Sequence, residues 1–117
     1  MAKGKFINKV PQRRVLKLEY SHTFEIHLQT VQAYGESAFG SRVVKEFYRD
    51  LMAKIIILPK TPNIYARSRF IGSTERKTYR NIVFRSYLVI YSVTSSTVRV
   101  IDIVHQSTNP DTIAEIN

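Results

Sequence analysis

The sequence contains no cysteine among its 117 residues. This absence excludes disulfide bonds, thiolate ligands for a metal ion and a cysteine nucleophile. A chain without cysteine fits a reducing compartment, so we expect the protein to be cytoplasmic.

Long apolar runs are missing as well. The longest run, from Ile55 to Leu58, is far shorter than the roughly 18–20 apolar residues that cross a bilayer. The basic N-terminus is not followed by the apolar core of a secretion signal. We therefore expect no membrane partner.

Acidic residues are scarce. Nine Asp and Glu stand against 18 Lys and Arg, which gives a formal net charge of +9. Such an imbalance indicates an acidic partner, namely nucleic acid, an acidic protein or an anionic surface, although a basic surface can also serve solubility alone.

Known enzyme signatures are also absent. The sequence has no glycine-rich phosphate-binding loop, no Gly-x-Ser-x-Gly and no His-Glu-x-x-His. Its histidines, His22, His27 and His105, lie far apart in the sequence, so we expect no metal site and no cofactor.

The chain is long enough for one domain. Residues 1–14 carry five Lys and Arg and no acid, and Pro11 interrupts them, so we read them as a basic N-terminal arm. Residues 15–117 are expected to form a single α+β domain, and 44% hydrophobic residues suffice for its core.

The first half of that domain predicts a strand and a helical hairpin. Residues 15–20 alternate apolar and polar side chains, as a half-buried strand does. Ser21 can cap a first helix that ends at Gly35, and a second helix runs from about residue 37 to about residue 57. The apolar stripes of the two helices comprise Phe24, Leu28, Val31 and Tyr34, and then Val44, Phe47, Leu51, Ile55 and Leu58.

The second half predicts three strands. A basic loop follows Pro59 and Pro62, and residues 79–84, 86–93 and 98–104 then read as strands. Helices followed by a run of strands indicate an α+β fold, in which the hairpin packs on a sheet containing a three-stranded antiparallel meander.

The basic and tyrosine-bearing C-terminal half offers the candidate site. Cations bind phosphates, and tyrosines stack on bases or fill the core. A metal-free ribonuclease uses the same groups, with cations that stabilise the phosphorane and a Tyr or His that moves protons. The candidates for binding nucleic acid or another target are Arg67, Arg69, Lys77, Arg80 and Arg85, and the catalytic candidates are Arg80, Arg85, Tyr87 and His105.

Two segments resemble the C-terminal half of RelE/ParE-type toxins from bacterial type II toxin–antitoxin modules. One is residues 79–93, with Tyr87, Tyr91 and Val93 in a Tyr-x-x-x-Tyr-x-Val pattern, and the other ends with His105 before Asn109-Pro110. The resemblance covers about residues 15 to 112. It implies a growth-inhibiting, plasmid-stabilising toxin held inactive by a cognate antitoxin.

The resemblance also implies a choice of target. RelE-like members cleave mRNA on the ribosome, and ParE-like members act on DNA gyrase. The position after Tyr87, where RelE-like members typically have a catalytic arginine, holds Leu88, and no basic cluster with a tyrosine follows the last strand. Both departures favour a ParE-like inhibitor and leave open whether the protein is an enzyme.

For a toxin, the basic charge predicts an acidic antitoxin. We expect an antitoxin helix to lie across an apolar and basic surface that includes Phe47, Leu51 and Tyr91. The remaining alternatives are a RelE-like mRNA endonuclease and a basic nucleic-acid-binding module without toxicity.

Overall fold

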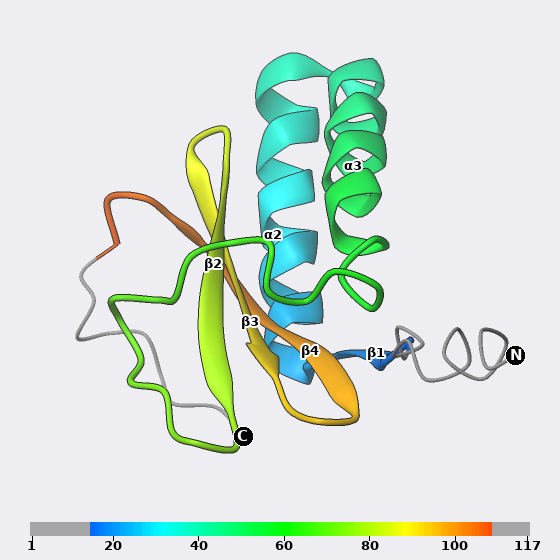
Figure 1. The fold of residues 1–117 in the computed structure, drawn as a ribbon. Coiled ribbons are helices and arrows are strands. Elements are labelled where there is room, and N and C mark those ends of the chain that lie inside the picture. The colour runs from blue at the N-terminus through cyan, green and yellow to red at the C-terminus, as the bar shows by residue number, and fades with distance from the viewer. Residues whose placement is uncertain (1–14, 109–117) are drawn as a thin grey trace, which may run out of the picture.

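The computed structural model describes residues 15–108, and the predicted basic arm of residues 1–14 lies outside them. One strand is followed by two helices and then by three strands (Figure 1). This order confirms the predicted α+β class. The elements are β1 (Lys17–Tyr20), α2 (His22–Phe39), α3 (Ser41–Ile55), β2 (Thr78–Phe84), β3 (Tyr87–Val93) and β4 (Thr97–His105).

The four strands form one mixed sheet in the order β1-β4-β3-β2. β2, β3 and β4 are antiparallel neighbours, as the predicted meander requires. β1 lies parallel to β4, with Lys17 opposite Thr97, because the helical hairpin carries the chain back before β2 begins. The sheet is therefore not antiparallel throughout.

The helical hairpin consists of α2 and α3. The side chain of Ser21 caps α2 by accepting a hydrogen bond of 2.9 Å from the Phe24 N–H. The prediction that Gly35 ends this helix is wrong, because α2 continues to Phe39 and ends at Gly40, whose φ of 95° suits glycine. A Cβ on Gly35 would lie 3.2 Å from Val44 Cγ2, so glycine there allows the helices to approach closely.

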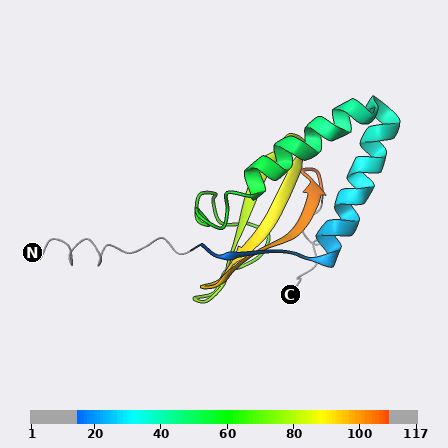
Figure 2. The ribbon, with the colours of Figure 1, turned by 90° about the vertical axis from the view of Figure 1, so that its right-hand side faces the viewer.

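The hairpin covers one face of the sheet (Figure 2). The main core lies between them and contains Phe24, Leu51 and Ile55 from the helices. A smaller cluster on the other face joins Ile71, from the connection between α3 and β2, to Ile90 of β3. No helix in the described part of the chain is long and apolar enough to cross a membrane.

Candidate functional site: an apolar cleft with a polar rim

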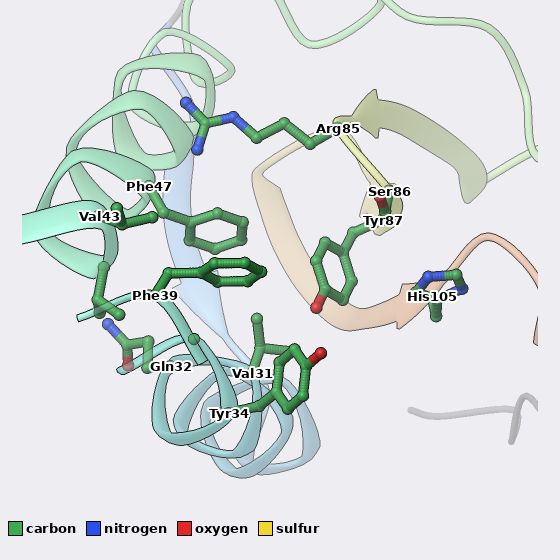
Figure 3. A pocket seen from close by; sticks show the side chains of 12 residues that line it. Val31, Gln32, Tyr34, Phe39, Val43, Phe47, Arg85, Ser86, Tyr87 and His105 are labelled. Carbon is green, nitrogen blue, oxygen red and sulfur yellow. The ribbon is translucent and has the colours of Figure 1, made fainter. Parts of the chain in front are cut away.

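A cleft of about 490 Å³ lies between the hairpin and one end of the sheet (Figure 3). Apolar side chains of the two helices form one wall. The turn between β2 and β3 and the end of β4 supply the polar part of the rim. The helix wall includes Val31, Tyr34, Phe39, Val43 and Phe47, and the polar part includes Arg85, Tyr87 and His105.

Two aromatic side chains near the turn of the hairpin are exposed to solvent. Tyr34 is 62% exposed and Phe39 is 64% exposed, and their rings pack edge to face with centroids 6.3 Å apart. The sequence places Tyr34 on the core stripe of the first helix, which is wrong because the helix extends beyond the core at this point. Large apolar side chains gathered at a surface indicate a binding site for another molecule.

Phe47 connects the hairpin to the sheet. Its ring packs edge to face on Phe84, with centroids 5.1 Å apart, and on Tyr87 at 5.8 Å. Phe84 is buried, whereas Phe47 and Tyr87 keep part of their surface in the cleft. The floor of the cleft is thus continuous with the core, which makes it rigid.

Arg85 places a positive charge at the rim. Its guanidinium lies over the rings of Phe47 and Phe84, 5.5 Å and 5.0 Å from their centroids. Its backbone has a φ of 56°, which side-chain-bearing residues rarely adopt. Its carbonyl accepts a hydrogen bond of 2.6 Å from Gln106 Nε2, so the segment after β4 helps to hold the turn.

Tyr87 and His105 are cross-strand neighbours beside Arg85. Their strands pair them directly, and their rings pack edge to face with centroids 5.6 Å apart. The N–H of Ser107 donates to His105 Nδ1 over 3.1 Å, and the Ser107 hydroxyl lies 2.8 Å from the same ring nitrogen. The candidates Arg85, Tyr87 and His105 therefore do come together at one rim.

A histidine and a buried acid extend this rim. His27 Nδ1 of α2 lies 2.6 Å from Asp102 Oδ1 of β4, and this oxygen also accepts the Ile103 N–H over 2.8 Å. Asp102 is only 3% exposed. His27 and Asp102 share a shallow groove of about 330 Å³ with Tyr87 and His105.

The sequence offered little sign of the pair of His27 and Asp102. The two residues are 75 positions apart. The only signal is that Asp102 interrupts the apolar run from Val100 to Val104, where an unpaired carboxylate would be costly to bury. A register shift in the pairing of β3 with β4 lies next to Asp102, and such bulges often redirect a side chain.

Comparison with known proteins identifies the family. A sequence model described as "ParE toxin of type II toxin-antitoxin system, parDE" matches residues 18–110. The chain belongs to this family. It is the toxin of a type II toxin–antitoxin system, and the match confirms the RelE/ParE resemblance of its sequence.

Two solved structures share the fold of this ParE-family toxin. One is the chromosomal ParDE toxin–antitoxin system from P. aeruginosa, with a TM-score of 0.64 and 11% identity over 79% of this chain and 97% of that one. The other is the archaeal RelE–RelB complex from Pyrococcus horikoshii OT3, with a TM-score of 0.59 and 15% identity over 81% and 99% of the two chains. No curated protein sequence matches the chain.

The cations predicted from the sequence do not form one cluster in the toxin. Arg80 Nη1 donates to the Tyr65 carbonyl over 2.7 Å, away from the cleft, and its backbone forms a bridge with Arg67. Arg69 and Lys77 also belong to the connection between α3 and β2. None of these four residues lines the cleft that contains Arg85.

Two of the three predicted antitoxin contacts are buried. Leu51 and Tyr91 have no exposed surface, because both belong to the core beneath the hairpin. The Tyr91 hydroxyl donates to the Pro62 carbonyl over 2.8 Å, and burial raises the pKa of Tyr91 to about 12. Of the three, only Phe47 reaches the cleft, and its contact with an antitoxin stays a prediction.

Among residues 15–108, no three His, Asp or Glu side chains are placed to hold a metal ion together. His27 and Asp102 have each other as partners, and His105 is paired with Ser107. These groups are suited to accept and donate protons or to bind a polar group of a partner.

Proposed function

We propose that this toxin inhibits growth by acting on DNA gyrase in the cytoplasm. The observation that carries the proposal is Leu88, which is 9% exposed and belongs to the sheet. Nucleases of the RelE type typically have a catalytic arginine at this position, whereas the Leu88 side chain offers only packing. Arg80, the other cation that the sequence offered, donates to the Tyr65 carbonyl.

We further propose that an acidic antitoxin neutralises the toxin by placing a helix in the cleft. The wall formed by Val31, Val43 and Phe47 suits the apolar face of such a helix, and Arg85 at the rim suits one of its acids. Buried apolar contacts would set the lifetime of the complex, and the net charge of +9 would speed its formation.

Purified gyrase and plasmid DNA test the first part of the proposal. Adding the toxin should stop supercoiling or cause cleaved DNA to accumulate, and adding the cognate antitoxin should reverse the effect. A similarly basic protein of another fold controls for charge. Normal supercoiling at a large molar excess of toxin would remove gyrase as the target.

Cell growth tests the second part. The substitution Val43→Arg should leave the toxin poisonous but make the antitoxin unable to rescue growth, because it puts a charge into the apolar wall. Val83→Arg makes the same change at an exposed valine outside the cleft and should still be rescued. Equal rescue of both variants would place the antitoxin elsewhere.

A second candidate function, mRNA cleavage, is favoured by the position of Tyr87 and His105 beside Arg85. A translating extract should then show new cuts in the message that disappear in His105→Ala. Arg80→Ala is the matched control, because Arg80 lies outside this rim. An intact message with the unmodified toxin would exclude this function.

A further inference from the structure

A second surface lies at the opposite end of the sheet from the cleft. β2 begins at Thr78, which is opposite Val93, and ends at Phe84, which is opposite Tyr87. Tyr87 lines the cleft, whereas Thr78 and Val93 line a separate groove of about 750 Å³. Because a strand rises about 3.3 Å per residue, roughly 20 Å of β2 separates the two places.

Most of the residues that line this groove are polar or charged. It lies between the last part of the connection from α3 to β2, which supplies Arg76 and Lys77, and the loop from β3 to β4, which supplies residues 94–96, Thr-Ser-Ser. The Thr78 hydroxyl beside them is buried without a hydrogen-bond partner among the described residues. Cations and hydroxyl groups are the side chains that contact the phosphates of nucleic acids.

Positive charge reaches this end of the sheet from separate segments. Lys17 of β1 pairs with Thr97, and its N–H donates to the Ser96 carbonyl over 2.9 Å. Within residues 15–108, no acid forms an ion pair with Lys17, Arg76 or Lys77. Glu75 is the one acid that lines the groove.

Further cations lie along the connection between α3 and β2. Arg67 and Arg69 precede the groove in the connection between α3 and β2, and both are exposed. The cleft that would hold the antitoxin uses none of these cations.

We propose that the groove between residues 75–78 and 94–96, here called the basic groove, binds the phosphate backbone of duplex DNA. Its cations would neutralise phosphates, and its hydroxyl groups would donate hydrogen bonds to them. Single-stranded nucleic acid is bound mainly by stacking on exposed aromatic rings. The lining of the basic groove contains no aromatic residue, and the nearby ring of Tyr79 packs beneath Lys77 and against the smaller core cluster.

Because the two surfaces lie at opposite ends of the sheet, the toxin can hold DNA in the basic groove while a partner occupies the cleft. The proposal does not depend on gyrase, because the groove would bind DNA in the absence of any other protein.

Fluorescence anisotropy with the full chain and a labelled duplex of about 20 base pairs, titrated between about 50 and 200 mM salt, tests this inference. The double variant Arg76→Ala, Lys77→Ala should bind roughly tenfold more weakly, and the slope of log K against log salt should fall by about 1.8. The double variant Arg42→Ala, Lys45→Ala removes the same charge from the exposed side of α3. It should bind within about twofold of the unmodified chain, because these residues lie outside the groove.

Equal losses of DNA affinity in the two double variants would show that only overall charge matters for binding, and this result would overturn the proposal. So would the absence of DNA binding by the unmodified chain. Because Lys77 also packs on Tyr79, the double variant Ser95→Glu, Ser96→Glu provides a test that leaves this packing intact, and unchanged binding by it would also refute the groove. Tighter binding to duplex RNA of the same sequence would refute the choice of DNA.

The supercoiling assay on the same variants separates this inference from the proposed function. A variant that loses DNA binding but still inhibits gyrase would leave the gyrase proposal in place. It would also show that the groove binds DNA without taking part in the inhibition of gyrase. A chain that binds DNA through the groove but has no effect on gyrase would leave the groove in place and remove the gyrase proposal.

Discussion

Arg85 Nη2 lies 2.7 Å from Asp50 Oδ2 and joins the turn between β2 and β3 to α3. The same guanidinium stacks over Phe47 and Phe84, so its position is determined by an ion pair and two rings together. The backbone at Arg85 adopts an unfavourable left-handed conformation to put the side chain there. The rim of the cleft thus contains a cation whose orientation the fold maintains.

The strain at Arg85 predicts a difference between two substitutions. Arg85→Asn and Arg85→Val both remove the guanidinium contacts, but only the β-branched valine strongly resists a φ of 56°. We expect Arg85→Val to be less stable than Arg85→Asn by about 1 kcal/mol. Urea unfolding of both variants measures the difference, and equal stabilities would show that the turn relaxes without cost.

The pair of His27 and Asp102 predicts a specific loss of stability. The substitution His27→Ala leaves the buried Asp102 carboxylate with fewer hydrogen bonds and should lower the free energy of unfolding by about 1–3 kcal/mol. The matched control is His22→Ala, because His22 is exposed at the first position of α2. It should change stability by less than about 0.5 kcal/mol. A similar effect of both substitutions would mean that the contact between His27 and Asp102 contributes nothing specific to stability.

The raised pKa of Tyr91 predicts that the folded protein loses stability in alkali. Burial raises the pKa of Tyr91 from the ordinary 10.0 of a solvent-exposed tyrosine to about 12 in the folded chain, so folding favours the protonated hydroxyl. This contribution is complete below pH 10 and is lost as the pH rises toward 12, by about 1.4 kcal/mol between pH 9 and pH 11.

The variant Tyr91→Phe isolates that contribution. It has no hydroxyl to titrate, so its stability should fall by about 1.4 kcal/mol less than that of the unmodified chain over the same pH interval. It should also be less stable at pH 8, because the Pro62 carbonyl loses its donor. Identical pH dependence in the two proteins would contradict the assignment to Tyr91.

The close approach of Gly35 to Val44 predicts that substitutions at these two positions have coupled effects on stability. Alanine within a helix is more favourable than glycine by about 1 kcal/mol, but a Cβ on Gly35 would lie 3.2 Å from Val44 Cγ2. Gly35→Ala should therefore stabilise the Val44→Ala variant by about 1 kcal/mol and the unmodified chain by less. A double-mutant cycle in urea measures this coupling, and additive effects would show that Val44 moves aside freely.

Local patterns in the sequence were enough to predict the class of fold. The alternation of residues 15–20, the Ser21 cap and the three apolar strands at the end predict the order of elements, which the structure confirms. These features are local, because capping and periodicity depend on residues a few positions apart. The end of the first helix was misplaced for the same reason, since only the close approach of Val44 explains why glycine occurs at position 35 inside a helix.

Local patterns could not predict which side chains meet, because those contacts depend on how the strands and helices pack. The parallel pairing of β1 with β4, the contact of His27 with Asp102 and the burial of Leu51 and Tyr91 all join residues distant in the chain. The predicted cations lie apart for the same reason: Arg85 lines the cleft, Lys77 lines the basic groove, and Arg80 lies between them within β2. Composition shows how much positive charge a chain carries, but strand register and the path of the connections determine where that charge lies.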